Sequence, residues 1–252
     1  MENMQKINSA LRSNVPWSLS LIGLLKDNKC EQIVCEKNCN YIALKNSWHE
    51  WLCYIDSKFY LNEFLCDMLS ELDDNRIIIY AKEDLFDNLV FDDEKIKYEV
   101  EDFMCCTRFI QGDSKYYIAQ TEDIPIISLM QTRYCIEEVG WKYYHLDINS
   151  YQKLYSQRLI DGKVFMDRSH MYSKVEVTDI FEQYGKINSV YTIFNQRGQG
   201  LATECLRGVL SWASDNRIKL CLNVRKDNDL AKKLYLKMGF RKNGAVLYLK
   251  KD

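Results

Sequence analysis

Residues 189–203, with the sequence SVYTIFNQRGQGLAT, place a strand, a glycine-containing turn and the start of a helix in immediate succession. The N–H groups of a first helical turn have no partner within the helix and lie at the positive end of its dipole. Gly198 and Gly200 allow the backbone to come close to a pyrophosphate, and Arg197 adds a positive charge. This junction therefore predicts an anion-binding cradle.

Other glycine turns that precede helices bind NAD or ATP, and neither alternative fits this one. A dinucleotide-binding turn has three glycines in the pattern G-x-G-x-x-G, whereas position 203 is threonine. A P-loop ends in G-K followed by serine or threonine, and this turn has no such ending. Taken alone, the turn is also compatible with an ordinary strand-to-helix connection.

Helix-like and strand-like patterns alternate along the chain, which predicts a mixed α/β fold. In the first half, an apolar stripe at helical spacing between Leu61 and Leu72 predicts a core-facing helix, and the acidic stretch 83–102 predicts a solvated surface. Small and polar residues at 111–114 predict a linker, with a domain boundary near residue 113. Beyond it we expect helices at 124–134, 150–159, 198–216 and 228–238, strands at 174–181, 186–194 and 218–224, and two short final strands at 240–243 and 245–251.

Composition limits the partners of the chain. Of its 252 residues 47% are hydrophobic, and 34 basic and 36 acidic side chains give a formal net charge of -2. This balance provides no global positive field for nucleic acid or anionic lipid. The longest apolar stretches, such as 17–25, are too short to cross a bilayer, and the N-terminus lacks a secretory pattern. We therefore expect a cytoplasmic protein that binds neither membrane nor nucleic acid.

Several of the 10 cysteines stand singly within apolar stretches, as reduced thiols do in a reducing compartment. Cys30, Cys35 and Cys39 form the one cluster, but their spacing differs from the C-x-x-C pairs typical of zinc sites. The sequence therefore predicts no metal centre.

A second informative segment, LNVRKDNDLAKKLYLKMGF, runs from Leu222 to Phe240. It predicts a strand, an asparagine at a helix start, a helix and a Gly-Phe ending. Together with Arg197-x-x-Gly200-x-Ala202, it resembles the cofactor-binding elements of the GNAT superfamily of N-acyltransferases. The matching residues of the second segment are Asn228, Ala231, Leu234, Tyr235, Gly239 and Phe240.

The resemblance covers about residues 116–252 and implies the GNAT fold, a mixed and mostly antiparallel central sheet flanked by helices. The segment from DGKVFMDR to VYT also resembles GNAT proteins in which a degenerate acyltransferase-like half precedes the working one. By this analogy, residues 1–113 are a degenerate GNAT-like domain and residues 114–252 the catalytic N-acetyltransferase domain, giving a tandem. The first half lacks the R-x-x-G-x-G/A turn and is expected to bind no cofactor.

The resemblance implies that acetyl-CoA is the cofactor and that a primary amine attacks its thioester directly. The backbone of Tyr191, Thr192 and Ile193 is then expected along the pantetheine arm, with a main-chain amide near Thr192 as oxyanion donor. Asn228 is expected at the same arm, although asparagine is also a favoured helix N-cap. The residues implied at the cofactor are Tyr191, Thr192, Ile193, Arg197, Gly198, Gln199, Gly200, Leu201, Ala202, Thr203, Asn228 and Ala231.

Two side chains are predicted to move protons. Tyr235 is the implied general acid, because it lies two helical turns after Asn228 on the same face and could return a proton to the CoA sulfur. A packed amphipathic tyrosine is the alternative explanation of this residue. Glu182 is the predicted general base, with a proton relay through water as the alternative. The other candidates on or beside the strands expected at the acceptor site are His170, Glu176 and Asp179.

Two other classes of function stay open at this point. A non-catalytic acyl-CoA sensor would keep the cradle without turnover, against which Tyr235 argues. An interaction module would use tyrosine-rich segments at 116–117 and 143–144. The acceptor also stays open among amino acids, polyamines, antibiotic amines, peptide N-termini and protein lysines, and no motif fixes the oligomeric state.

Overall fold

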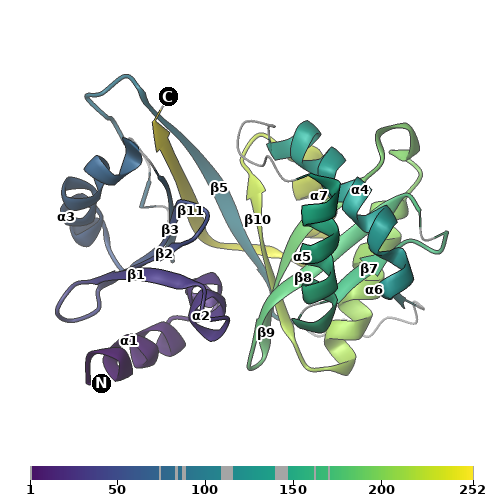
Figure 1. Ribbon diagram of the computed structural model, residues 1–252, viewed down its shortest axis with the longest axis horizontal. Helices are drawn as coiled ribbons and strands as arrows, with labels where there is room; N and C mark the ends of the chain where they lie inside the picture. Colours follow the sequence, from purple (N-terminus) through teal and green to yellow (C-terminus); the bar gives the residue numbers. More distant parts are fainter. Residues whose placement is uncertain are drawn as a thin grey trace. The chain divides into compact units, whose positions relative to one another are not determined.

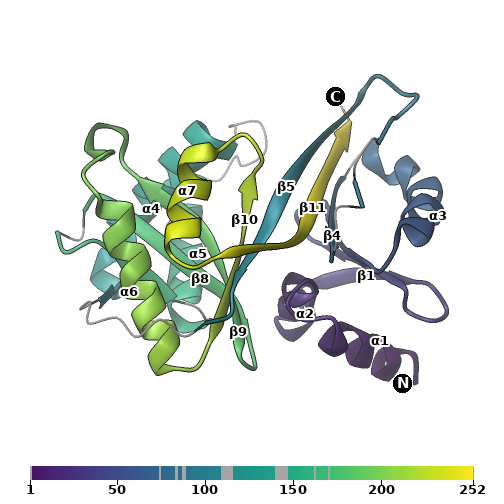
Figure 2. The same cartoon turned by 180° about the vertical axis from the view of Figure 1, so that it is seen from behind.

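The computed structural model describes residues 2–73, 75–82, 85–86, 89–108, 116–139, 147–161, 163–169 and 171–251. The chain forms two compact units. Unit 1 combines both ends of the chain, Met1–Cys105 and Cys221–Asp252, and unit 2 is the middle segment, Cys106–Leu220. Each unit has a β-sheet covered by helices (Figures 1 and 2), so the predicted mixed α/β class is confirmed.

Unit 1 is built on a mostly antiparallel sheet with the strand order β1-β2-β3-β4-β11-β5-β10. Among the strand pairs of this sheet whose register is described, β3 and β4 are parallel and the others are antiparallel. The strands are β1 (Cys30–Cys35), β2 (Tyr41–Asn46), β3 (Glu50–Ile55), β4 (Arg76–Ala81), β5 (Ile96–Cys106), β10 (Lys219–Arg225) and β11 (Arg241–Lys251). The helices are α1 (Glu2–Ser13), α2 (Leu19–Lys26), α3 (Lys58–Met68), the 3-10 turn η1 (Leu69–Asp73) and α7 (Asp229–Lys237).

Side-chain alternation divides the core of unit 1 between the two faces of the sheet. The face under α3 carries Ala43, Cys53 and Ile79, which lie in one apolar cluster with Phe64 of the helix. The apolar stripe predicted from the sequence is confirmed, because Leu61, Phe64, Leu65, Met68 and Leu72 are all buried. Helices α1 and α2 cover the other face, as Figures 1 and 2 show.

The last strand of the chain lies inside the sheet of unit 1. β11 is antiparallel to both β4 and β5, and Leu247 faces Ile79 on one side and Val100 on the other. The sequence predicted two short strands here, and this is wrong, because the chain continues through Gly244 with a register irregularity at that point. Gly244 has φ 150°, a conformation that suits a residue without a Cβ.

Unit 2 has the strand order β9-β8-β7-β6, and its neighbouring strands are antiparallel. Figures 1 and 2 show α4 and α5 side by side over one face of this sheet and α6 over the other. The strands are β6 (Tyr117–Ile118), β7 (Lys163–Met166), β8 (Ser173–Phe181) and β9 (Tyr184–Thr192). The helices are the 3-10 turn η2 (Thr121–Asp123), α4 (Ile124–Tyr134), the π-helix η3 (Cys135–Val139), α5 (Ile148–Asp161), the 3-10 turn η5 (Phe194–Gln196) and α6 (Leu201–Asp215).

Most predicted elements are confirmed, with two differences beside β11. The helix expected from residue 198 begins at Leu201, because Gly198 and Gly200 have left-handed φ values of 78° and 82° and cannot continue a right-handed helix. The acidic stretch 83–102 is a solvated surface only in part, since β5 begins at Ile96 and Asp102 is buried.

Several expectations fall on residues outside the described ranges. These are the linker at 111–114 with the boundary near 113, the candidate base His170, and the tyrosines at 143–144. The assignment of 1–113 and 114–252 to two domains of different function stays a prediction. In the part of the chain that the structure describes, no helix is long and apolar enough to cross a bilayer.

We predict that Gly244→Ala disrupts the centre of the unit 1 sheet. An added Cβ would lie 2.3 Å from the carbonyl oxygen of Ala81 and 2.8 Å from Nε1 of Trp17, in a φ region that alanine avoids. The expected loss of unfolding free energy is about 2–4 kcal/mol, measured by chemical denaturation. Gly198→Ala is the matched control, because φ is also positive there but an added Cβ meets open space. Equal losses in both variants would contradict the steric explanation.

Candidate functional site

The end of strand β9 forms one side of the candidate site. β8 and β9 are antiparallel, with Ser173 opposite Thr192 and Lys174 opposite Tyr191. The next paired residues are Glu176 and Asn188, so β9 has one more residue than β8 in this interval and forms a β-bulge. The bulge bends β9 just before the three residues expected along the pantetheine arm.

A buried carboxylate fixes the chain that faces the end of β9. Asp167 accepts hydrogen bonds from the backbone amides of Ser169, Tyr172 and Ser173, at 3.1, 2.9 and 2.8 Å, and from the Ser169 hydroxyl. Burial raises the pKa of Asp167, but these hydrogen bonds outweigh it and lower the pKa overall. The Ser173 hydroxyl lies 2.9 Å from Oγ1 of Thr192. Asp167 therefore anchors the strand end through Ser173.

Two of the backbone groups expected along the pantetheine arm have partners within the chain. The Ile193 amide donates to the carbonyl of Tyr172 at 2.9 Å. The Thr192 carbonyl accepts a hydrogen bond from Nε of Arg197 at 3.0 Å. One of the two acceptor positions of the Thr192 carbonyl is therefore occupied by the arginine.

The turn from Arg197 to Thr203 has the geometry of an anion cradle. Gly200 is the N-cap of α6 and has no side chain to cap the helix, and the Glu204 amide is the first that bonds back to it, at 2.9 Å. The amides of residues 201–203 therefore have no partner in the helix. An added Cβ would meet nothing within 4 Å at Gly198 or Gly200, and both glycines are exposed. Two exposed glycines thus precede the positive end of a 15-residue helix, whose first amides have no partner within the helix.

Arg197 does not present its charge to this cradle. Its Nη2 lies 2.7 Å from Oε2 of Glu137 and 3.2 Å from Oε1 of Glu138, two residues of the π-helix η3. Its guanidinium carbon lies 5.7 Å from the ring centre of Tyr191 and 5.5 Å from that of Phe194. The positive charge predicted for the cradle is therefore paired with two carboxylates.

Tyr191 belongs to the same group of contacts. It is buried, and its hydroxyl donates to Oε1 of Glu137 at 2.9 Å. Burial and this carboxylate raise the pKa of Tyr191 to about 12, so the phenol stays protonated at neutral pH. Glu137 therefore contacts both Tyr191 and Arg197.

The other predicted cofactor residues, Asn228 and Ala231, lie in unit 1 with Tyr235. The Asn228 side chain caps α7 by accepting a hydrogen bond from the Ala231 amide at 3.1 Å. Tyr235 is buried and its ring contacts Phe240 edge-on, with 5.9 Å between ring centres. Asn228 is therefore a helix N-cap and Tyr235 is a packed aromatic side chain, as the alternative explanations from the sequence predicted. Cofactor contact by either residue stays a prediction.

A buried carboxylate from the first half of the chain anchors α7. Asp102 of β5 lies 3.1 Å from Nζ of Lys232 on α7 and 3.1 Å from Nζ of Lys242 on β11. Burial raises the pKa of Asp102, but the two lysines outweigh it and lower the pKa overall. The helix that carries Tyr235 is therefore tied to β5 by an ion pair.

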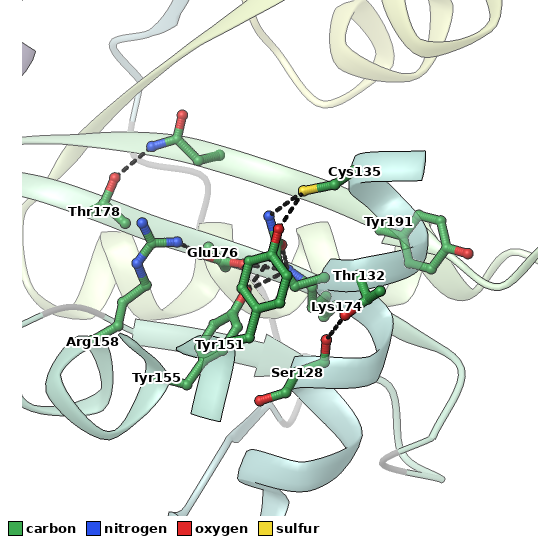
Figure 3. Close-up of polar contacts among 12 residues, drawn as sticks. Ser128, Thr132, Cys135, Tyr151, Tyr155, Arg158, Lys174, Glu176, Thr178 and Tyr191 are labelled. Atoms are coloured by element: carbon green, nitrogen blue, oxygen red, sulfur yellow. Dashed lines mark hydrogen bonds and ion pairs between the residues drawn. The ribbon is translucent and has the colours of Figure 1, made fainter. Parts of the chain in front are cut away.

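A buried polar cluster lies between α4, α5 and β8 (Figure 3). Lys174 donates hydrogen bonds to Gln131 at 2.8 Å, to the Tyr155 hydroxyl at 3.0 Å, and to the Glu176 carboxylate. Glu176 is fully buried and also bonds Tyr155 and Arg158. Burial raises the pKa of Glu176, but Lys174 and Arg158 lower it to about 2. This carboxylate is therefore held in its charged form.

The cluster bears on the choice of general base. Glu176 is buried and paired with two cations, so it cannot take a proton from an acceptor in solvent. Glu182, the predicted base, is exposed at the turn that joins β8 to β9. From Tyr184 to Thr192 the strand advances eight residues, or about 26 Å along its axis. Glu182 and the cradle therefore lie at opposite ends of β9, and its role as base stays a prediction.

Sequence reasoning missed the partners of the residues that it named. Glu137 and Glu138 lie about 60 residues before Arg197, and no local pattern links them. Lys174 could have been found, because opposite charges two positions apart on a strand share one face. Asp167, with polar residues directly after it, also fits a side-chain-to-backbone turn. In the described ranges no group of three or more metal-binding side chains occurs.

The segment that contains the cradle matches a known protein family. Residues 167–240 match the sequence profile of the acetyltransferase (GNAT) family. No curated protein matches the sequence significantly.

Solved structures extend the likeness to nearly the whole chain. A GCN5-related N-acetyltransferase from Kribbella flavida has a TM-score of 0.60 at 14% identity, with 96% of this chain and 95% of that chain covered. A protein from Novosphingobium aromaticivorans, described as a GNAT-family acetyltransferase, has a TM-score of 0.58 at 15% identity, covering 94% and 97%. A GNAT-family acetyltransferase from Colwellia psychrerythraea has a TM-score of 0.55 at 14% identity, covering 86% and 82%. The predicted GNAT fold is therefore confirmed, and it includes the first half of the chain.

We predict that the fold depends on Glu176 as the counter-charge of the buried Lys174. Glu176→Gln leaves Lys174 buried without its counter-charge and should lower the free energy of unfolding by about 3–5 kcal/mol, measured by chemical denaturation. Because the pKa of Glu176 is lower in the folded protein than in the unfolded chain, its contribution is present above about pH 4.3 and is lost as pH falls toward 2. Glu176→Gln should lack this part of the acid dependence.

The exposed Glu122 provides a control, since Glu122→Gln should change stability by less than about 0.5 kcal/mol. The double variant Lys174→Met/Glu176→Leu removes the buried lysine and carboxylate together and leaves only Arg158, whose side chain is 28% exposed, so it should recover most of the loss. Equal stability of Glu176→Gln and the wild type would contradict the prediction.

Proposed function

We propose that this chain transfers an acetyl group from acetyl-CoA to a primary amine, because residues 167–240 match the sequence profile of the acetyltransferase (GNAT) family. The family match supports acyl transfer in general, and the N-acetyl specificity belongs to the proposal. The observation that carries it is the turn before α6, where two exposed left-handed glycines precede unpaired helix amides. The acceptor is a small-molecule or peptide amine, and the proposal places the reaction in the cytoplasm.

The residues of this turn fit the pyrophosphate of CoA. An added Cβ would meet nothing within 4 Å at Gly198 or Gly200, so the backbone can be approached closely there. The pyrophosphate then lies against the amides from Gly198 to Thr203, where the helix dipole favours negative charge. The proposed holding residues are Tyr191, Thr192, Ile193, Arg197, Gly198, Gln199, Gly200, Leu201, Ala202, Thr203, Asn228 and Ala231.

Acetyl-CoA supplies the thioester carbonyl that the amine attacks. A main-chain amide near Thr192 is proposed to donate to the carbonyl oxygen, and the anchoring of this strand end by Ser173 keeps such a donor in place. Tyr235 is proposed to hold a proton on its phenol oxygen and to return it to the departing sulfur. Glu182 stays the predicted base, with a relay through water as the alternative.

We predict that Gly200→Glu abolishes binding of CoA and acetyl-CoA. The new side chain brings bulk and a negative charge to the position where the pyrophosphate is proposed to lie. Juxtaposed like charges cost several kcal/mol, so affinity should fall at least about 100-fold in isothermal titration. Gly200→Ala adds only backbone strain, because its Cβ meets open space, and should keep measurable binding.

A matched charge control is Gln183→Glu, which adds the same charge at the exposed turn between β8 and β9. It should bind CoA as the wild type does. A wild-type protein that binds neither CoA nor acetyl-CoA would overturn the proposed function. Binding without thiol release in the presence of primary amines would instead indicate an acyl-CoA sensor.

We predict that Tyr235→Phe lowers turnover about 100-fold while CoA affinity stays within about twofold of the wild type, because the hydroxyl that would hold the proton is removed and the aromatic ring is kept. The measurement is free-thiol release from acetyl-CoA with a panel of amines that includes a polyamine, an aminoglycoside and a peptide. Phenylalanine keeps the ring contact with Phe240. Undiminished thiol release would exclude Tyr235 as general acid.

A further inference from the structure

Arg197 contacts residues of η3 and the end of β9. Its guanidinium is bonded to Glu137, Glu138 and the Thr192 carbonyl, and it lies against the ring of Tyr191. The side chain of Arg197 is 40% exposed, so it can leave these partners without disturbing a buried core. The contacts therefore give the arginine defined partners and leave it accessible enough to exchange them.

We propose that Glu137 and Glu138 are positioning residues that hold Arg197 away from the cofactor, so that CoA has to displace the arginine before its charge contributes to binding. This inference rests on the proposed function, because it concerns the affinity of the same site. Arg197 has the place of the arginine in the R-x-x-G-x-G/A turn, and in the free protein its charge is more than neutralised. One guanidinium and two carboxylates together carry a net charge of -1.

Arg197 also occupies a backbone acceptor that is proposed to lie along the pantetheine arm, the Thr192 carbonyl. Nε of Arg197 donates to this oxygen at 3.0 Å, and Thr192 belongs to the backbone proposed to lie along the pantetheine arm. One side chain thus covers a cofactor acceptor and also withholds a positive charge from the phosphates. Displacement of Arg197 from the carboxylates releases both at once, which couples the two ends of the cofactor site within unit 2.

The local helix geometry explains how two successive residues reach one guanidinium. Residues Cys135–Val139 form a π-helix after α4. A π-helix has i→i+5 hydrogen bonds and therefore more residues per turn than an α-helix. Successive side chains then diverge by less than the ~100° of an α-helix, and Glu137 and Glu138 can point toward the same partner. The Tyr191 hydroxyl fixes Glu137 from the other side, at 2.9 Å.

The test is the affinity of Glu137→Gln/Glu138→Gln for CoA, measured by isothermal titration. Glutamine keeps the size of the side chain and an oxygen for the Tyr191 hydroxyl while removing the charge. Each exposed ion pair changes an equilibrium only a few-fold, so the double variant should bind CoA about threefold to tenfold more tightly than the wild type. A gain in affinity is informative because structural damage would weaken binding.

Two further variants separate the proposed contact from general charge effects. Glu31→Gln/Glu122→Gln removes two exposed carboxylates elsewhere and should leave the affinity unchanged within about twofold. The Arg197→Met background removes the residue that Glu137 and Glu138 are proposed to hold. There the two glutamine substitutions should gain less than about twofold, since their effect acts through Arg197.

The outcomes distinguish this inference from the proposed function. A wild type that binds CoA with the same affinity as Glu137→Gln/Glu138→Gln, or more tightly, overturns the holding role alone. A gain that persists in full with Arg197→Met shows direct repulsion and also overturns it. If neither protein binds CoA, the proposed function fails and this inference fails with it.

Discussion

The site depends on the left-handed backbone at Gly198 and Gly200, which delays the start of α6 until Leu201. A right-handed continuation from residue 198 would pair the following amides within the helix and close the turn. Because both glycines have positive φ, the helix starts three residues later and its first N–H groups stay accessible. The proposed anion site is therefore formed by the main chain, and side chains would only modify its affinity.

The charged side chains around this turn are paired with one another. Arg168 lies 2.9 Å from Glu204 in the first turn of α6, and Arg197 is paired with Glu137 and Glu138. These five side chains carry two positive and three negative charges, so they add no net positive charge to the turn. Attraction for an anion comes first from the amides and the helix dipole. With the proposed role of Glu137 and Glu138, the charge of Arg197 becomes available only when CoA replaces these carboxylates as its partner.

The sequence predicted the parts of the fold and site that depend on local chemistry. The strand of β9, the glycine turn, the helix α4 and the Asn228 cap all follow from nearby residues, and the structure has each of them. The contacts of Arg197 could not be predicted, since they join residues about 60 positions apart. The single strand β11 was missed because Gly244 resembles a turn in the sequence, whereas its partners on both sides keep it extended.

The position of β11 explains why the first half of the chain matters to the second. Its residues pair with β4 on one side and β5 on the other, so a cut near residue 113 separates two strands from the one that joins them. The same half supplies Asp102, which pairs with Lys232 on the helix that carries Tyr235. A segment that begins after residue 113 keeps β11 and α7 but loses both of the strands that flank β11 and the carboxylate that anchors α7. The first half is therefore part of the framework of the helix on which the proposed proton donor lies, even though it has no cofactor turn of its own.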